Sequence, residues 1–254
     1  MEIVRWMSLT FDEIRSPNRS LCLVSEGLKS MVALRKVLTA GSTEVTLLDA
    51  DAARILIEGF VPPSTLVTSS VLDHIDAHMR HFIEASPLCF ISSADADGVQ
   101  EVSPRGDPQG SFKVLNERTL AIADRPGNNR IDTLKNMLVN PQLGLIFVIP
   151  GVEETLRISG LGCISVDLDL LSSMSVQNRA PRLAIIVEVR KAHLHCAKAF
   201  RRSRVWEKDS QVPRNMLPSF ATMIADQVKL SEQKRLELEA RIDRSNTENL
   251  WEQK

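Results

Sequence analysis

The sequence predicts a mainly β fold, a β-barrel with helices packed outside it. Three observations indicate this class. Seven or so short segments have the apolar patterning of strands, hairpin-type turns join several of them, and small helical segments separate others. A doubly wound α/β fold is excluded, because it needs a helix after nearly every strand and the chain contains no GxGxxG sequence.

The N-terminal region, residues 1–68, contains no motif, and we treat it as an extension of unclear structure. Pro62 and Pro63 close this region as a linker. The elements expected within it are a helix over 30–38, a strand over 44–48 and a helix over 50–58.

The central region, residues 69–206, opens with apolar residues at helical spacing, which predict a helix over 70–83. Ser70 and Asp73 have the spacing of a capping box, and Pro87 ends the helix. The strands expected after it cover 88–93, 99–102, 112–115, 120–123, 143–149, 155–159, 163–166 and 183–189. Hairpin turns are expected at 95–98 and 116–118, and helices over 131–139, 167–173 and 195–206.

The C-terminal region, residues 207–254, is highly charged. Its last part, 230–254, has only a weak apolar stripe, which predicts a solvated helix with frayed ends.

Composition and charge exclude several classes of function. The net charge is −1, from 31 basic and 32 acidic residues, so the chain has no overall attraction to nucleic acid or to an anionic membrane. Aromatic residues make up 4% with no Tyr, which argues against a platform for base stacking. No apolar run is long enough to span a bilayer, and the first twenty residues lack the apolar core of a signal peptide. The four cysteines lie far apart, as in a reduced cytoplasmic protein, and we expect that localisation.

Two loops carry the candidate site. Residues 103–108 follow one expected strand with Ser103, Pro104 and Arg105, and residues 124–130 follow another, with Asp124, Arg125, Asn128, Asn129 and Arg130. Pro and Gly make such loops stiff, and arginines on stiff loops suit an anionic ligand, above all a phosphate. The alternative is that both loops are polar only because they are solvated, with their arginines paired to surface carboxylates.

The segments DGVQEVSPRGDPQG, RTLAIADRPGNNRIDTLKNMLVNPQLGLIFVIPGVEETLRISG and HCAKAFRRSRVW resemble the pyridoxamine 5′-phosphate oxidase-like flavoproteins. Within them, the SPRGD and DRPGNNR blocks are similar to a bacterial-type branch of FMN-dependent enzymes. The resemblance covers roughly residues 71–206. It implies a split-barrel fold, a homodimer, and FMN in a groove at the subunit interface.

The resemblance also implies which residues hold FMN. Val102, Ser103, Pro104 and Arg105 are expected alongside the flavin ring and ribityl chain, and Arg105 near the pyrimidine edge would stabilise the anionic reduced flavin. A helix N-terminus attracts phosphate, and the helix after 124–130 offers Asn128, Asn129 and Arg130 at its start. The other residues expected at the cofactor are Thr155 on its strand and, from the second subunit, Lys198, Arg201 and Ser203.

The chain also departs from the family pattern. The classical oxidase binds its substrate with basic and hydroxyl residues that include a Tyr, and this chain has no Tyr. Vitamin B6 oxidation is therefore not expected. A second departure is Ser111, a one-residue insertion after the SPRGD loop.

We expect an FMN-dependent oxidoreductase in which no side chain is assigned as a catalytic acid or base. The alternatives are a flavin, F420 or haem carrier or sensor without turnover, and a structural dimer with a decayed groove.

A metal site is not expected. His74, His78 and His81 share one side of the first helix of the central region, but no acidic or Cys partner stands at a ligand spacing.

Overall fold

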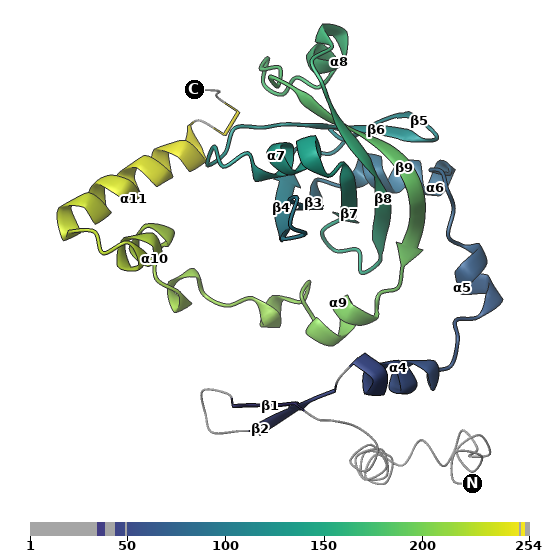
Figure 1. Ribbon diagram of the computed structural model, residues 1–254. Helices are drawn as coiled ribbons and strands as arrows, with labels where there is room; N and C mark the ends of the chain where they lie inside the picture. Colours follow the sequence, from purple (N-terminus) through teal and green to yellow (C-terminus); the bar gives the residue numbers. More distant parts are fainter. Residues whose placement is uncertain (1–34, 39–43, 49, 249, 252–254) are drawn as a thin grey trace, which may run out of the picture. The chain divides into compact units, whose positions relative to one another are not determined.

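The computed structural model describes residues 35–38, 44–48, 50–248 and 250–251, in two compact units that divide after Ser64. In the first unit, β1 (Arg35–Leu38) and β2 (Glu44–Leu47) pair as an antiparallel hairpin, and α4 (Ala50–Glu58) follows (Figure 1). The expected strand over 44–48 and helix over 50–58 are confirmed. The helix expected over 30–38 is wrong over 35–38, because the backbone there pairs with β2; its other residues lie outside the described ranges.

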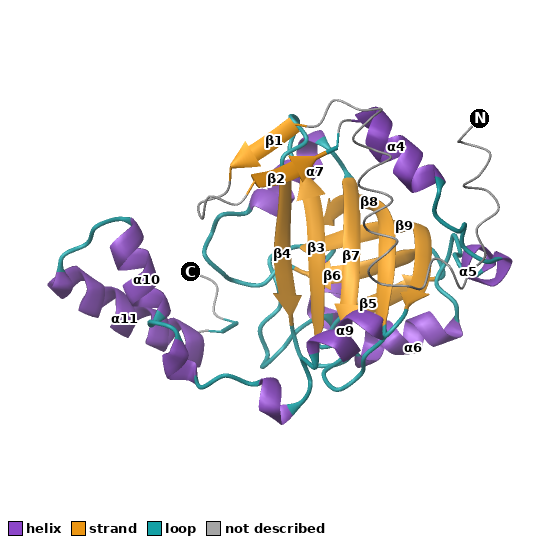
Figure 2. Cartoon of the chain, turned by 90° about the horizontal axis from the view of Figure 1, so that it is seen from below, coloured by secondary structure: helices purple, strands orange, loops and turns teal. Residues whose placement is uncertain are grey.

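The second unit is built on one seven-stranded antiparallel sheet, in the order β4-β3-β7-β8-β9-β6-β5. Helices lie around it (Figure 2), so the expected mainly β fold with peripheral helices is confirmed. The strands are β3 (Leu88–Ala94), β4 (Gln100–Gly106), β5 (Lys113–Asn116), β6 (Thr119–Ala123), β7 (Gln142–Val148), β8 (Thr155–Ser165) and β9 (Ala184–His195).

The helices of this unit are mostly short. They are α5 (Thr65–Ser69), α6 (Ala77–Ala85), α7 (Asp132–Val139), α8 (Leu168–Ser173), α9 (Lys198–Ser203), α10 (Phe220–Gln227) and α11 (Glu232–Thr247), with 3₁₀ turns at Lys208–Ser210 and Arg214–Met216. The solvated helix expected in 230–254 is α11, none of whose residues is buried, whereas α5 and α10 were not foreseen. No helix among the described residues is long and apolar enough to cross a membrane.

The sheet curls around its main core, and a smaller buried cluster lies under α8. Ile91 of β3, Phe147 of β7 and Ile122 of β6 belong to one buried cluster, although these strands stand second, third and sixth in the sheet order. Ile83 of α6 is fully buried in the same cluster, and the ring of Phe112 packs edge-on against Phe147 at 5.3 Å between ring centres. Burial of these side chains is the main force that holds the curled sheet.

The first helix of the central region begins later than expected. It starts at Ala77, where the Asp76 side chain caps it by accepting a hydrogen bond from the Met79 amide at 2.8 Å. The predicted capping box at Ser70 and Asp73 is wrong, because Leu72 forms a β-bridge with Ala192 of β9 instead. The chain is therefore held in extended form before the helix starts.

Strand β4 continues through the segment expected to be a loop. Its pairing with β3 runs from Ala94↔Gln100 to Leu88↔Gly106, so 103–106 are strand residues. Pro104 is accommodated because β4 is an edge strand, where a missing N–H on the free side costs no ladder hydrogen bond. The predicted loop is thus restricted to the residues after Gly106.

The two strands expected at 155–159 and 163–166 are one strand, β8, with a bulge between Ser159 and Gly160. The bulge lets the strand bend without ending. Gly160 is required there, since a Cβ at this position would lie 2.3 Å from the carbonyl oxygen of Glu188. The expected final strand, 183–189, likewise extends as β9 to His195.

Candidate functional site

Two ion pairs join the ends of β4 and β6. The Arg105 Nη1 lies 2.6 Å from Asp124 Oδ1, and the Arg125 Nε lies 2.7 Å from Asp107 Oδ2. Each strand end thus contributes one cation and one anion. The side chains of Asp107 and Arg125 are only 5% and 12% exposed, so this pair lies in the interior. The segments 103–108 and 124–130, expected to share one site, do meet in the fold.

Arg125 is occupied by structural partners. Besides Asp107, its Nη2 donates to the carbonyl oxygen of Met174 at 2.7 Å, and its Nη1 reaches that of Arg179 at 3.5 Å. This guanidinium therefore fastens the end of β6 to the connection after α8, and its donors already have acceptors.

Arg105 is only partly satisfied. Its Nη1 binds Asp124, but its Nε is buried and has no hydrogen-bond partner. Buried donors are nearly always paired, and leaving one unpaired costs roughly 1–3 kcal/mol. The Arg105 Nε lies where the two predicted loops meet. A hydrogen-bond acceptor on a ligand could satisfy this nitrogen.

The connection from β6 to α7 runs along β4. Asp124 contacts Arg105 near the end of β4, while Arg130 is close enough to Glu101, near its beginning, to feel its charge. The hydrogen bond to Asp132 is the main cause that raises the pKa of the Arg130 guanidinium, and Glu101 adds to it. The inward side of β4, with Ser103 at its centre, thus faces this connection.

The N-terminus of α7 carries no side-chain cap. Asn129 and Ile131 before it both have left-handed backbones, with φ of 59° and 50°. The Asn128 side chain holds this turn by accepting a hydrogen bond from the Arg130 amide at 3.1 Å. Asn tolerates this conformation, but in the β-branched Ile131 it is rare and costly, and such outliers are found often at ligand-binding segments.

Arg130 itself is exposed and bound to Asp132 at 2.6 Å, within the first turn of α7. The guanidinium and the uncapped amides are thus presented together, with one carboxylate beside them. An anion arriving here would have to displace Asp132 from Arg130.

The four β4 residues expected at the cofactor point to opposite sides of the sheet. Ser103 pairs with the buried Ile91 and Arg105 with the buried Cys89, so both face inward. Val102 is 60% exposed, and Pro104 is exposed as well. The structure therefore brings only Ser103 and Arg105 toward the 124–130 connection.

The remaining predicted residues lie on β8 and on α9, at the end of the sheet where β4 also ends. Thr155 is buried at the start of β8, opposite His195. Arg201 of α9 binds Glu153 at 2.6 Å and the Ser203 hydroxyl donates to the Phe200 carbonyl, while Lys198 is exposed. Within one chain, α9 is thus held against the turn that precedes β8.

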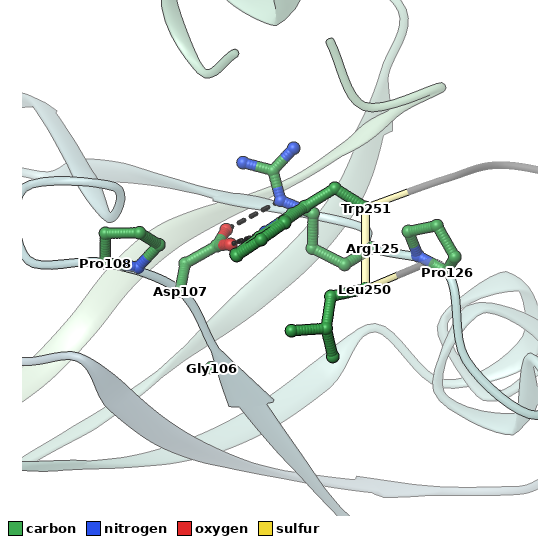
Figure 3. A pocket seen from close by; sticks show the side chains of 7 residues that line it. All are labelled: Gly106, Asp107, Pro108, Arg125, Pro126, Leu250 and Trp251. Atoms are coloured by element: carbon green, nitrogen blue, oxygen red, sulfur yellow. Dashed lines mark hydrogen bonds and ion pairs between the residues drawn. The ribbon is translucent and has the colours of Figure 1, made fainter. Parts of the chain in front are cut away.

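A pocket that sequence reasoning missed lies beside the ion pair of Asp107 and Arg125 (Figure 3). Its volume is about 410 Å³, and Trp251 forms part of its wall by donating from Nε1 to Asp107 Oδ1 at 3.1 Å. Asp107 and Trp251 are 144 positions apart, so no local pattern indicated this contact. The lining residues are Gly106, Asp107, Pro108, Arg125, Pro126, Leu250 and Trp251.

Within the described part of the chain, no group of three or more His, Cys, Asp or Glu side chains could hold a metal ion. His74 of the predicted histidine set is bonded through Nδ1 to Asp73 at 2.9 Å.

A family model described as pyridoxamine 5′-phosphate oxidase matches residues 75–201, half of the chain. The chain belongs to the pyridoxamine 5′-phosphate oxidase family. The match includes β3 to β9 and therefore both segments of the candidate site. A comparison with curated protein sequences gives no match.

Solved structures resemble this family member only distantly. HupZ from Group A Streptococcus is 19% identical, with 46% of this chain and 91% of HupZ covered and a TM-score of 0.38. A general stress protein 26-related protein of the pyridoxinephosphate oxidase family from Clostridium acetobutylicum is 11% identical, with 46% and 85% covered and a TM-score of 0.35. The haem storage protein HutZ from Vibrio cholerae is 13% identical, with 48% and 93% covered and a TM-score of 0.35. These similarities are too low to transfer a ligand or an activity.

Proposed function

We propose that this family member is an FMN-dependent oxidoreductase whose substrate is not vitamin B6. The observation that carries the proposal is the alignment of the 124–130 connection along the inward side of β4. It puts the uncapped start of α7, Arg130, Ser103 and the unpaired Arg105 Nε along one strand.

The residues present fit a flavin phosphate at the start of α7. The free amides of the first turn and the helix dipole favour an anion, and Arg130 adds a charge-assisted contact. Asn128 and Asn129 shape the turn that presents these groups. Asp132 and Glu101 oppose a phosphate, so binding requires Arg130 to exchange Asp132 for the ligand.

The flavin ring is proposed to lie toward Ser103 and Arg105. Its acceptors would satisfy the Arg105 Nε, and the positive charge would favour the anionic reduced ring. When bound, the isoalloxazine supplies the electron-transfer chemistry, while the side chains bind and orient it. An Arg105→Ala variant with an unchanged flavin reduction potential would refute this role.

We further propose a homodimer in which Lys198, Arg201 and Ser203 reach the site of the second subunit. Support comes from the outward side of β4, β3 and β7, where four apolar side chains gather. Phe90 and Val102 are 36% and 60% exposed, Pro104 lies opposite Phe90, and Ile146 follows on β7. An apolar surface of this kind is typical of a protein interface.

The second candidate function is a flavin, F420 or haem protein without turnover. The chain has no Tyr, and its substrate-binding set does not match that of the classical oxidase, so binding without catalysis is consistent with the residues present. Turnover with NAD(P)H or reduced F420 as electron donor would distinguish the enzyme from the carrier.

The test is the visible absorption spectrum of the purified protein, with FMN added if it is colourless. Oxidised-flavin bands are expected, and Asn129→Gly combined with Arg130→Gln should abolish them. The matched control is Arg190→Gln, which removes one exposed cation paired with Glu188 on β9. A protein that takes up no FMN, or a double variant that binds it as the wild type does, would contradict the proposal.

A further inference from the structure

The outward side of β8 and β9 carries a group of basic side chains that the proposed flavin site does not use. Leu156 and Ile158 of β8 and Ala192 of β9 face the core, so their alternating neighbours face outward. Arg157 lies directly opposite His193, and Lys191 and His195 lie two residues away on either side along β9. We call Arg157, Lys191, His193 and His195 the basic cluster.

On its own sheet the cluster has one outward carboxylate, Glu188 of β9, which is bound to Arg190. The outward residues of β4, β3 and β7 include no acidic side chain. Glu101, the one acidic residue on these three strands, faces inward from β4. On β8 the outward neighbours are the hydroxyl residues Thr155 and Ser159.

The nearest carboxylates on the neighbouring segments are bound elsewhere. Glu188 of β9 binds Arg190 at 3.0 Å. Glu153, in the turn before β8, binds Arg201, and Glu154 beside it is close enough to act on the same guanidinium. Asp73, next to the bridge from Leu72 to Ala192, binds Arg118 and His74.

His193 is the centre of the cluster and lacks a partner. Its Nδ1 is buried and makes no hydrogen bond with any described residue. Burial lowers the pKa of the imidazole, and the charges of Arg157, His195 and Lys191 lower it further. Positive side chains thus surround an unsatisfied ring nitrogen, and no described carboxylate pairs with them. This arrangement suits the binding of an anion.

We propose that the basic cluster binds the phosphate group of a small molecule, at a site separate from the start of α7. Directly opposite residues have Cβ atoms about 5 Å apart, and outward neighbours along a strand stand about 7 Å apart, so Arg157, His193 and Lys191 can reach one tetrahedral anion. His195, one outward step beyond His193, adds positive charge beside them. Arg157 offers a bidentate fork and Lys191 a point charge, while His193 donates one N–H when neutral and gains a second donor and a positive charge when protonated. Ser159, opposite Lys191, adds a hydroxyl.

The test is a histidine NMR titration of the full chain with inorganic phosphate, at ionic strength held constant with sodium chloride. The His193 ring signal is assigned by its loss in His193→Gln. Saturable phosphate binding should raise the pKa of His193. Arg157→Gln with Lys191→Gln should weaken phosphate binding by about tenfold or more, since two charge-assisted contacts are lost. The control Arg190→Gln, on the same strand but paired with Glu188, should leave it within about twofold of the wild type.

Four results would overturn the site. Chloride alone could raise the His193 pKa equally, or Arg190→Gln could weaken binding as much as the double variant, either of which indicates general screening. A double variant that changes oligomeric state would show that the cluster meets protein. FMN uptake, measured in parallel, separates the two proposals. Phosphate binding without FMN uptake refutes only the flavin site. Loss of FMN uptake in the double variant would mean that the basic cluster is part of the flavin site, which refutes a separate phosphate site.

Discussion

Arg105 and Asp124 form an ion pair at 2.6 Å. Arg105 lies on β4, the first strand in the sheet order, whereas Asp124 directly follows β6, the sixth strand. Asp107 and Arg125, two and one positions further along, repeat the contact with the charges reversed. Backbone hydrogen bonds do not join β4 to β6, so side chains close the sheet on this side. The first pair is 15% and 23% exposed, which places its strength between that of a surface pair and a buried one.

Breaking this pair should destabilise the protein measurably. We expect Arg105→Gln to lower the free energy of unfolding by about 1–3 kcal/mol, because Asp124 keeps its charge and loses its partner. Urea unfolding without flavin measures the loss, and a double-mutant cycle with Asp124→Asn isolates the pair. Arg118→Gln, which breaks the pair with the 60% exposed Asp73, is the control and should cost less than about 1 kcal/mol. Equal losses at both sites would show that partial burial adds nothing.

The hydrogen bond from Trp251 to Asp107 should hold the C-terminal end of the chain. Trp251→Phe keeps the ring but removes the donor, so we expect faster amide hydrogen exchange in α11 and a loss of about 1 kcal/mol. Trp206→Phe is the matched control. It also removes an indole N–H, but that N–H binds the Val152 carbonyl, and Trp206 lies just before the C-terminal region. Exchange in α11 that is the same in both variants and the wild type would contradict the contact.

Gly160 should tolerate no side chain. A Cβ there would lie 2.3 Å from the Glu188 oxygen and 2.9 Å from Val187 Cγ1, so Gly160→Ala must disrupt the pairing of β8 with β9. We expect a loss of about 2–3 kcal/mol or more in thermal or urea unfolding. Gly127→Ala, where no atom lies within 4 Å of the added Cβ, should be close to neutral. A neutral Gly160→Ala would mean that the bulge is absent.

The cysteines should differ in reactivity. Cys89 is fully buried in the core, and burial raises the pKa of its thiol far above the ordinary value, so almost no thiolate forms. Cys163 and Cys196 are exposed. With iodoacetamide under native conditions, peptide mass spectrometry should find Cys163 and Cys196 modified and Cys89 modified only after unfolding. Labelling of all three at similar rates would contradict the buried position of Cys89.

Asp73 should titrate below the usual range of a carboxyl group. The His74 imidazole is the main cause, and Arg118 adds to it; both lower the pKa of Asp73. Because the folded-state pKa is lowered, the contribution to stability is present above the unfolded-state pKa and is lost as pH falls through the folded-state value. Carboxyl NMR titration should show the pKa of Asp73 rising in Arg118→Gln, and an unchanged value would remove Arg118 as a cause.

Local patterns predicted much of the fold. The turn at 95–98 is confirmed, with Gly98 at φ 81° and the Asp95 side chain accepting from the amides of Asp97 and Val99. Helix α7 ends at Val139 as Asn140 and Pro141 indicate. These elements are set by residues close in sequence, which is why they could be read from it.

The errors arise where pairing partners override local preference. Pro104 and Gly106 are typical of a loop, yet β3 keeps them in a strand. Gly160 and Gly162 suggested a break, yet they make room for Glu188 and for Leu143 and Met137. At the candidate site, the types of residue were predictable, but the reciprocal ion pairs and the inward direction of Ser103 and Arg105 follow from how the sheet curls.

The position of Pro104 on the edge strand also bears on solubility. The free edge of a sheet is a template on which another extended chain can add itself, and such additions lead to aggregates. Pro104 has no N–H to offer on that edge and so interrupts the row of donors halfway along β4. The residue that looked like a loop former thus limits strand addition at this edge, while Ser103 and Arg105 on either side of it face inward.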